Sequence, residues 1–178
     1  MKKFLLVIVS TLLLLAAHKV ESAEMKVGTV NFQQALNEVD QGKKAKAALK
    51  TEFDSKQKKL NIQQEELKKL QEDFEKQKAV LSQDALMAKQ KTFQDKYLEL
   101  QKSMASYRDE LVAKEAKMTG SILQNLKTVV ADVGQKEGFT LVMEVAQDAV
   151  LYVQSKEDLT EKVVKLYNQK FSGPLKTE

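Results

Sequence analysis

The residues that most often carry out enzyme chemistry are almost missing from this chain. The 178 residues include no cysteine, and the one histidine, His18, lies in an apolar N-terminal stretch that we expect to be removed. Without either residue, a chain has no thiol nucleophile, no Ser-His-Asp triad and no zinc site of the usual kind. Carboxylates are plentiful, but on charged helices they usually face solvent. We therefore expect neither an enzyme nor a metal site.

A second candidate for chemistry is Gly42-Lys43-Lys44, which looks like part of a phosphate-binding loop. That loop needs another glycine five positions earlier, where this sequence has Asn37, and a serine or threonine directly after the lysine. Neither requirement is met, so we expect no bound nucleotide and no other cofactor. Nucleic acid is also excluded as a partner, because no basic surface with interleaved aromatic residues is visible.

The N-terminal stretch has the order of a secretory signal peptide. Lys2 and Lys3 precede an apolar run over residues 4–17, and the small residues Ser22 and Ala23 follow. The run is short for a membrane-spanning helix, which needs roughly 20 apolar residues. We predict a cleaved signal peptide over residues 1–23 and an exported mature chain. A retained membrane anchor is the alternative.

Residues 43–119 contain neither glycine nor proline, and their apolar residues recur in heptads. The first run is Phe53, Leu60, Leu67, Phe74 and Leu81, and the second is Leu86, Phe93, Tyr97, Leu100, Met104, Tyr107 and Leu111. Such spacing is typical of a coiled coil. Ser82-Gln83-Asp84 separates the runs, and Ser82 suits a helix N-cap. Two runs of equal length predict a helical hairpin arm with its tip near residues 82–85; one continuous helix in a parallel oligomer is the alternative.

The residues on either side of the arm predict a small β-containing body, so the fold class is mainly α with a small β body. Residues 25–31 read as one strand, and residues 139–145 and 150–153 read as two more that form a hairpin with its turn at Gln147-Asp148. A last helix is expected to start at Asp158, with Glu161 placed for a capping box. The body then comprises residues 24–42 and 120–172, and residues 173–178 form a tail.

A body of fewer than about 80 residues without disulfides is marginally stable alone, and short exposed strand edges favour pairing with another chain. We therefore expect the body to assemble into an oligomer. Candidates for the contact are apolar residues of the predicted strands. They are Val27, Val30, Phe139, Leu141, Val150 and Tyr152.

The arm carries 18 Lys and Arg residues against 13 Asp and Glu residues. This surplus of positive charge favours attraction of acidic clients, lipopolysaccharide or anionic lipid headgroups, although it is also compatible with an ordinary solvated surface. The basic candidates flank the expected tip. They are Lys76, Lys78, Lys89 and Lys91.

Several apolar residues of the arm lie off the heptad seam, where a two-helix hairpin does not need them. Leu98, Ala105 and Val112 recur every seven residues, and Val80 and Met87 lie near the tip. These five residues are candidates for binding a client, because dispersed apolar side chains, methionine among them, suit adaptable contacts. Either the heptad-spaced stripe packs on a neighbouring subunit near the body, which its position favours, or it faces a cavity and contacts a client.

The order of these segments resembles the Skp/OmpH family of periplasmic chaperones. The matching stretches are Lys26-Val-Gly-Thr-Val-Asn-Phe32, Gly42-Lys43-Lys44-Ala45, Leu81-Ser-Gln-Asp-Ala85, Gly138-Phe-Thr-Leu-Val-Met143 and Ala149-Val-Leu-Tyr152. The resemblance implies a homotrimer with three arms around a cavity. It also implies an ATP-independent periplasmic holdase that keeps unfolded outer-membrane proteins from aggregating before barrel assembly. A structural or adaptor coiled coil of the cell envelope is the alternative.

Overall fold

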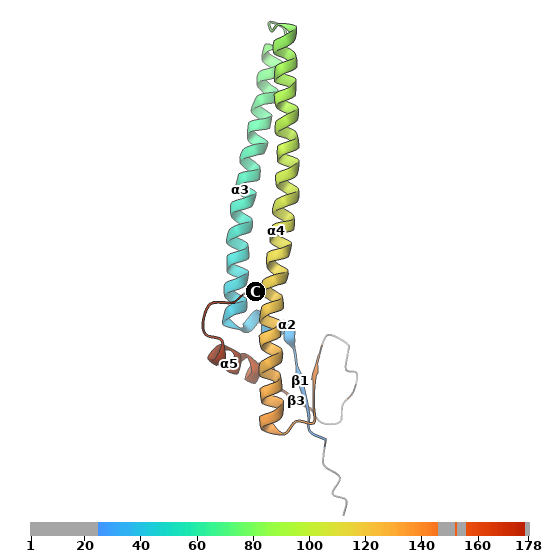
Figure 1. Ribbon diagram of the computed structural model, residues 1–178, viewed down its shortest axis with the longest axis vertical. Coiled ribbons are helices and arrows are strands. Elements are labelled where there is room, and N and C mark those ends of the chain that lie inside the picture. The colour runs from blue at the N-terminus through green and yellow to red at the C-terminus, as the bar shows by residue number, and fades with distance from the viewer. Residues whose placement is uncertain (1–24, 146–151, 153–155, 177–178) are drawn as a thin grey trace, which may run out of the picture.

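A computed structural model of the chain describes residues 25–145, 152 and 156–176. Two long antiparallel helices, α3 and α4, rise together from a small base that holds the other elements (Figure 1). The predicted fold class, mainly α with a small β body and a long helical hairpin, is confirmed. The elements are β1 (Val27–Val30), α2 (Phe32–Glu38), α3 (Asp40–Gln77), α4 (Gln83–Glu137), β2 (Leu141–Glu144), β3 (Glu157–Asp158) and α5 (Thr160–Lys170).

The chain reverses direction between the end of α3 at Gln77 and the start of α4 at Gln83, so the turn occupies residues 78–82, next to the predicted tip near residues 82–85. Helix α3 has 38 residues, which at 1.5 Å per residue is about 57 Å of helix. Helix α4 begins after Ser82, whose hydroxyl accepts a hydrogen bond from the backbone N–H of Ala85 at 3.4 Å. A serine N-cap satisfies one of the free N–H groups of the first turn. This cap fixes the start of α4 and so the length of the hairpin arm.

Helix α4 continues for 55 residues, through the arm and into the base. It ends at Gly138, which has a φ of 71° and whose backbone N–H donates to the carbonyl of Gly134. Glycine adopts this left-handed conformation without the steric cost that a Cβ would bring. Among the described residues, no helix is long and apolar enough to cross a membrane.

The base holds a three-stranded parallel sheet with β1 at its centre, in the order β2-β1-β3. The prediction for residues 139–145 is confirmed in part, since β2 covers residues 141–144. Tyr152 is not in a strand, and the predicted turn at Gln147-Asp148 and the candidate Val150 lie outside the described residues. The predicted antiparallel hairpin is therefore not among the described strands, each of which pairs in parallel with β1.

The start of the last helix also differs from the prediction. Asp158 belongs to β3, and α5 begins at Thr160. The Asp158 carboxylate accepts hydrogen bonds from the Thr160 hydroxyl at 2.6 Å and from its N–H at 2.9 Å, and these bonds lower the pKa of Asp158. The N-cap of α5 is therefore Leu159, which makes no side-chain cap hydrogen bond, and not Asp158 as the capping box with Glu161 predicts. Pairing with Thr29 of β1 holds Asp158 in the sheet, from where its carboxylate binds the first residue of the helix.

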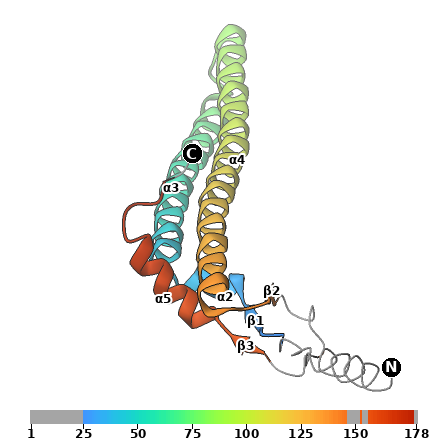
Figure 2. The same ribbon diagram turned by 60° about the horizontal axis from the view of Figure 1, so that its bottom comes forward.

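The hydrophobic core of the body lies between α4, α5, α2 and β1. Figures 1 and 2 place α5 on one side of the lower part of α4 and the strands on the other. The broad apolar stripe of α4 packs here, as its wider spacing indicates. The buried residues are Val30, Phe32, Ala35, Val39, Ala45, Ile122, Leu126, Val129, Val133, Leu159, Val163 and Tyr167.

Helix α5 also holds the junction at which α2 ends and α3 begins. Tyr167 is fully buried and donates a 2.5 Å hydrogen bond to Oε1 of Gln41. Burial raises the pKa of Tyr167, so the phenol stays protonated and remains a donor. The side chain of Asn168 accepts a bond from the backbone N–H of Asp40 at 2.9 Å. Two side chains of α5 therefore fix the residues at which the arm leaves the body.

Candidate functional site

The seam between α3 and α4 is narrow. Leu67 and Leu100 are its buried residues, each with 8% of its surface exposed. Phe93 and Tyr107, seven residues before and after Leu100, are half-buried beside it. The arm is therefore held together along one line of side chains, with most of its surface open to solvent.

Three residues that the heptads place in the seam are instead half-exposed. Phe53 is 53% exposed, Tyr97 47% and Met104 48%. Ser103 takes the inward position next to Met104, and its hydroxyl accepts a 3.3 Å hydrogen bond from the side-chain amide of Gln63. Steps of four and three residues fit two rotations of α4 about its own axis, one with Met104 facing α3 and one with Ser103 facing it. The polar side chain of Gln63 on α3 favours the second rotation, because Ser103 can accept its hydrogen bond.

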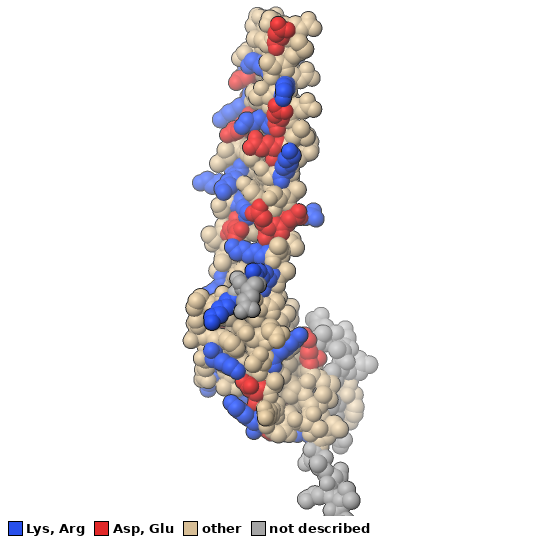
Figure 3. Space-filling model, viewed as in Figure 1, with Lys and Arg blue, Asp and Glu red and all other residues tan. Residues whose placement is uncertain are grey.

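One flank of the hairpin is crossed by ion pairs between α3 and α4, and we call it the ion-paired flank. Lys56 lies 2.5 Å from the carboxylate of Glu110, and Lys96 lies 3.3 Å from that of Glu66. Lys114 pairs with Glu52. Figure 3 shows basic and acidic side chains next to each other along one face of the arm. The residues that define this flank are Glu52, Lys56, Gln63, Glu66, Lys96, Ser103, Glu110 and Lys114.

These ion pairs alter the acidity of their members in the expected directions. The hydrogen bond from Lys114 lowers the pKa of Glu52, and the bond from Lys56 lowers that of Glu110. The bond to Glu110 raises the pKa of Lys56. All of these groups stay ionised at neutral pH. Their exposure means that solvent screens the pairs, so they fix the register of the two helices more than they stabilise the fold.

The opposite flank carries few ion pairs and is formed mainly by uncharged side chains, and we call it the neutral flank. An α-helix turns by about 100° per residue, so a residue directly after one that lies between the ion-paired flank and the seam, such as Lys56, Gln63 or Ser103, points to the other side of the seam. Phe53, Gln57 and Gln64 of α3 follow such members, as do Tyr97 and Met104 of α4. The uncharged residues that define the neutral flank are Phe53, Gln57, Asn61, Gln64, Gln71, Gln94, Tyr97, Leu98, Gln101, Met104, Ala105 and Val112. The same spacing places five charged residues among them, Lys50, Asp54, Lys68, Arg108 and Glu115, and Lys50 is paired with Asp54 at 3.3 Å.

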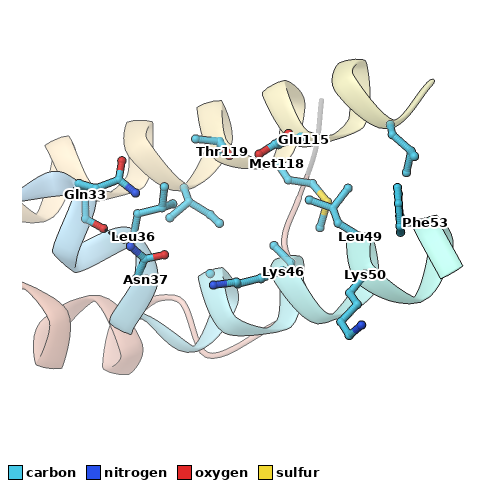
Figure 4. A pocket seen from close by; sticks show the side chains of 14 residues that line it. Gln33, Leu36, Asn37, Lys46, Leu49, Lys50, Phe53, Glu115, Met118 and Thr119 are labelled. Atoms are coloured by element: carbon cyan, nitrogen blue, oxygen red, sulfur yellow. Dashed lines mark hydrogen bonds between the residues drawn. The ribbon is translucent and has the colours of Figure 1, made fainter. Parts of the chain in front are cut away.

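At its lower end the neutral flank opens into a groove of about 490 Å³ at the base of the arm. Leu49 and Met118 approach each other across its floor, and Phe53 closes its upper end (Figure 4). The helices separate here because α2 packs between them; Gly42 lies so close to the carbonyl of Leu36 that a Cβ would be 1.8 Å from its oxygen. Phe53 belongs to both the groove and the flank, so the two surfaces are continuous.

Comparison with known proteins assigns the chain to a family. Residues 26–167 match the family described as "Outer membrane protein (OmpH-like)". The chain belongs to the OmpH-like family. It is 26% identical to a Skp-like protein of Pseudomonas aeruginosa over 169 residues, which are 95% of this chain and 99% of that one. The fold is similar to that of an OmpH-like protein of Caulobacter crescentus CB15, described as an outer membrane chaperone, with a TM-score of 0.74, 24% identity, and coverage of 84% of this chain and 87% of that one.

In this OmpH-like chain the five candidates for client contact are all exposed, along the length of the arm. Val80 at the tip is 84% exposed, Met87 57%, Leu98 45% and Val112 59%. Ala105 is exposed between the last two. They belong to one helical arm but not to one patch, because the first two lie near the tip and the other three on or beside the neutral flank.

The four basic candidates near the tip do not form one cluster of unpaired charge. Lys78 is paired with Glu75, and Lys91 lies 2.8 Å from Asp95 on its own helix. Lys76 is exposed, and Lys89 is half-buried. Two of the four charges are therefore offset by neighbouring carboxylates, which weakens the site that the sequence indicates for anionic headgroups.

The candidates for self-association differ in how accessible they are. Leu141 is 44% exposed and Tyr152 84%, whereas Val30 is 1% exposed and packs inside the body of its own chain. Val27 is half-buried. The ring of Phe139 is also half-buried, and the ammonium of Lys26 lies 4.0 Å from its centre.

Two features of the arm escaped the sequence analysis. One is the row of glutamines on the neutral flank, Gln57, Gln64 and Gln71, although their spacing of seven residues was visible. The other is the groove at the base, which exists only because α2 separates α3 from α4. Among the described residues, no group of three His, Cys, Asp or Glu side chains is placed to hold a metal ion.

Proposed function

We propose that this OmpH-like protein is an ATP-independent holdase chaperone of the periplasm, which binds unfolded outer-membrane proteins between helical arms and keeps them from aggregating. The observation that carries the proposal is the line of large apolar side chains left exposed on an arm of about 57 Å, Phe53, Tyr97, Leu98, Met104 and Val112. Soluble proteins rarely leave such a series uncovered unless it contacts a partner.

The mechanism follows from how these contacts are spread. Each exposed side chain offers weak apolar contact, and single contacts exchange quickly. Several arms around one client give high overall affinity without any tight single site, because each further contact forms within the same complex. Such a complex releases its client without nucleotide hydrolysis as soon as the client can bury its own apolar residues elsewhere.

The proposal includes a homotrimer assembled through the bodies. Two exposed apolar residues of the base support this assembly, Leu141 in the edge strand β2 and Tyr152. Residues 1–23 would be cleaved as a signal peptide on export to the periplasm. Residues 24–42 and 120–172 would then form the shared body, and residues 43–119 the arm.

The experiment that tests the proposal uses the mature chain from residue 24 and an outer-membrane barrel protein diluted from urea. Light scattering should fall as the chain is added, and native mass spectrometry should find about one trimer per client. Unchanged scattering at several-fold excess over the barrel protein would reject the holdase function.

An adaptor coiled coil that bridges envelope components is a second candidate, favoured by the 84% exposure of Val80 at the tip. It predicts one defined partner bound at the tip. Val80→Ser with Met87→Ser would then abolish binding, whereas a holdase should lose only a small part of its activity. The same tip variant, with Lys76→Gln and Lys89→Gln added, tests whether lipopolysaccharide or anionic vesicles bind there.

A further inference from the structure

The two flanks of the arm present different chemistry to anything that approaches them. On the ion-paired flank, the ammonium groups of Lys56, Lys96 and Lys114 already contact carboxylates of the facing helix. These groups are satisfied within the hairpin. On the neutral flank, Tyr97 and Met104 stay about half-exposed. On the same flank, Gln57 donates one hydrogen bond to Asn61 at 2.9 Å and keeps its second N–H and its carbonyl oxygen for other partners. The arm thus has one side whose charged groups are paired with each other and one side whose exposed groups are mainly uncharged.

The amides of the neutral flank can form hydrogen bonds with any polypeptide backbone. Gln57, Gln64 and Gln71 are exposed and lie one heptad apart, about 10.5 Å along the helix axis. A glutamine side chain carries both donors and an acceptor. Every peptide group of an unfolded chain carries one donor and one acceptor, whatever its sequence. A row of glutamines therefore fits an extended chain without selecting particular side chains.

The groove at the base adds a place for large apolar side chains. Its floor consists of Leu49, Leu111 and Met118, and Phe53 connects it to the rest of the flank. Three charged residues line it, Lys46, Lys50 and Glu115. Lys50 is paired with Asp54, which leaves Lys46 and Glu115 with opposite charges. The groove therefore favours an uncharged apolar group over either an anion or a cation.

The charge balance of this flank also selects among possible occupants. An anionic lipid surface needs several unpaired Lys or Arg residues. Here Lys50 is paired with Asp54. The other basic residues, Lys68 and Arg108, share the flank with Glu115. A second arm packed in a permanent interface needs a continuous apolar core. Here amides separate the apolar residues, as Gln101 lies between Leu98 and Met104 along α4.

We infer that the neutral flank is the side of the arm that holds the client, and that it binds uncharged, extended segments of unfolded polypeptide through glutamine–backbone hydrogen bonds and dispersed apolar contacts. The inference rests on the proposed function. It assigns the ion-paired flank to solvent, and it makes the groove at Phe53 the deepest contact of the bound segment.

Because the chain contains no cysteine, single cysteines can report on each flank. Two matched pairs of exposed residues are Gln57 with Lys59, and Gln101 with Glu99. The members of each pair are two positions apart, which is about 200° around the helix and about 3 Å along it, so Lys59 and Glu99 lie on the side of the ion-paired flank. Each of the four residues is changed to Cys in turn in the full mature chain and labelled with a polarity-sensitive dye. Adding a urea-diluted barrel protein should shift the emission to the blue at positions 57 and 101 and leave it unchanged at positions 59 and 99.

Each other outcome of the labelling experiment has a definite meaning. Equal shifts on both flanks, or larger ones at positions 59 and 99, overturn the inference. So does no shift at any position while the unlabelled chain still suppresses scattering, and in that case the holdase function stands. If scattering is not suppressed either, the proposed function fails. Protection of the labels at 57 and 101 from a soluble quencher before client is added assigns the flank to a neighbouring copy and overturns the inference.

A charge variant tests the glutamine row directly. Gln57→Glu, Gln64→Glu and Gln71→Glu keep the side-chain shape and helix propensity but place three carboxylates on the flank. We expect client affinity to fall about tenfold or more, because binding an uncharged segment would then remove water from the three carboxylates.

The control changes the net charge by the same amount on the outer side of α3, with Lys58→Gln, Lys69→Gln and Lys76→Gln. Its affinity should change less than about threefold if charge at a distance is screened. Circular dichroism should show equal helix content in both variants. Equal losses of affinity in the two variants would mean that the net charge of the arm, and not the glutamine row, controls binding. That result would overturn the inference.

Discussion

The body and the arm share helix α4 but are held together in different ways. In the body, Ile122, Leu126 and Val133 of α4 are at most 2% exposed and pack against several elements. In the arm, Leu100 is the one buried residue of the same helix, at 8%, and it packs against α3 alone. The comparison indicates that stability resides in the body, while the arm has the freedom to adapt to a partner.

The largest expected effect comes from truncating one leucine in each region of α4. Leu126→Ala should lower the free energy of unfolding by about 3 kcal/mol, within the usual 2–5 kcal/mol for a buried leucine, because it leaves a cavity in a closed core. Leu100→Ala should cost less than half of that, because the arm can close over the gap. Urea denaturation followed by circular dichroism compares them. Equal losses would remove the distinction between the regions.

A smaller effect is expected where the body fixes the start of the arm. Tyr167→Phe removes the hydrogen bond to Gln41 and leaves a buried acceptor without its partner, which should cost about 1–2 kcal/mol. Hydrogen exchange should also become faster at the start of α3 than in the rest of that helix. Tyr152→Phe, at an exposed position, is the control and should change neither quantity.

The arm should gain stability when its polar seam is replaced. Oε1 of Gln63 is buried without a hydrogen-bond partner among the described residues. Gln63→Leu with Ser103→Leu should stabilise the hairpin by about 1 kcal/mol, since apolar area is buried and an unsatisfied group is removed. Hydrogen exchange of the arm should slow while that of the body stays the same. If hydrogen exchange in the arm slows and the variant still binds clients of every size, flexibility of the arm is not needed for binding.

The smallest effect concerns pH and the ion-paired flank. The pKa values of Glu52 and Glu110 are lowered from their ordinary value of 4.5 by their lysine partners. Their contribution is therefore fully present above pH 4.5 and is lost as the pH falls through the lowered values. Spin labels on α3 and α4 should show a looser arm as the pH falls below 4.5. Lys56→Gln should make the distance between the two spin labels less dependent on pH. An unchanged pH dependence would exclude these ion pairs as its cause.

Local signals explain what the sequence predicts well. Ser82 and Gly138 mark helix ends through their own backbone preferences, and the wider apolar stripe after Met118 marks the part of α4 that enters a core. The parallel sheet is different, because pairing of β1 with β2 joins residues more than 100 positions apart and leaves no periodic trace. Such pairing depends on where α4 ends, because this end fixes the position at which β2 begins.

The neutral flank could be predicted only in part, for a related reason. Leu98, Ala105 and Val112 stand out because their seven-residue spacing lies off any seam. Tyr97 and Met104 did not, because a heptad with steps of three and four fits two helix faces. Which face turns inward depends on the polar residues of α3, and this information lies across the hairpin rather than within α4.

The most direct test of the central claim shortens the arm and keeps the body. The contacts of Gln63 with Ser103 and of Lys56 with Glu110 show which residues face each other. Deleting residues 57–70 and 96–109 removes two facing heptads from each helix and shortens the arm by about 21 Å. We predict an unchanged oligomer with a folded body and at least a tenfold loss in suppression of client aggregation. A shortened chain that suppresses aggregation as well as the full-length arm would contradict the account.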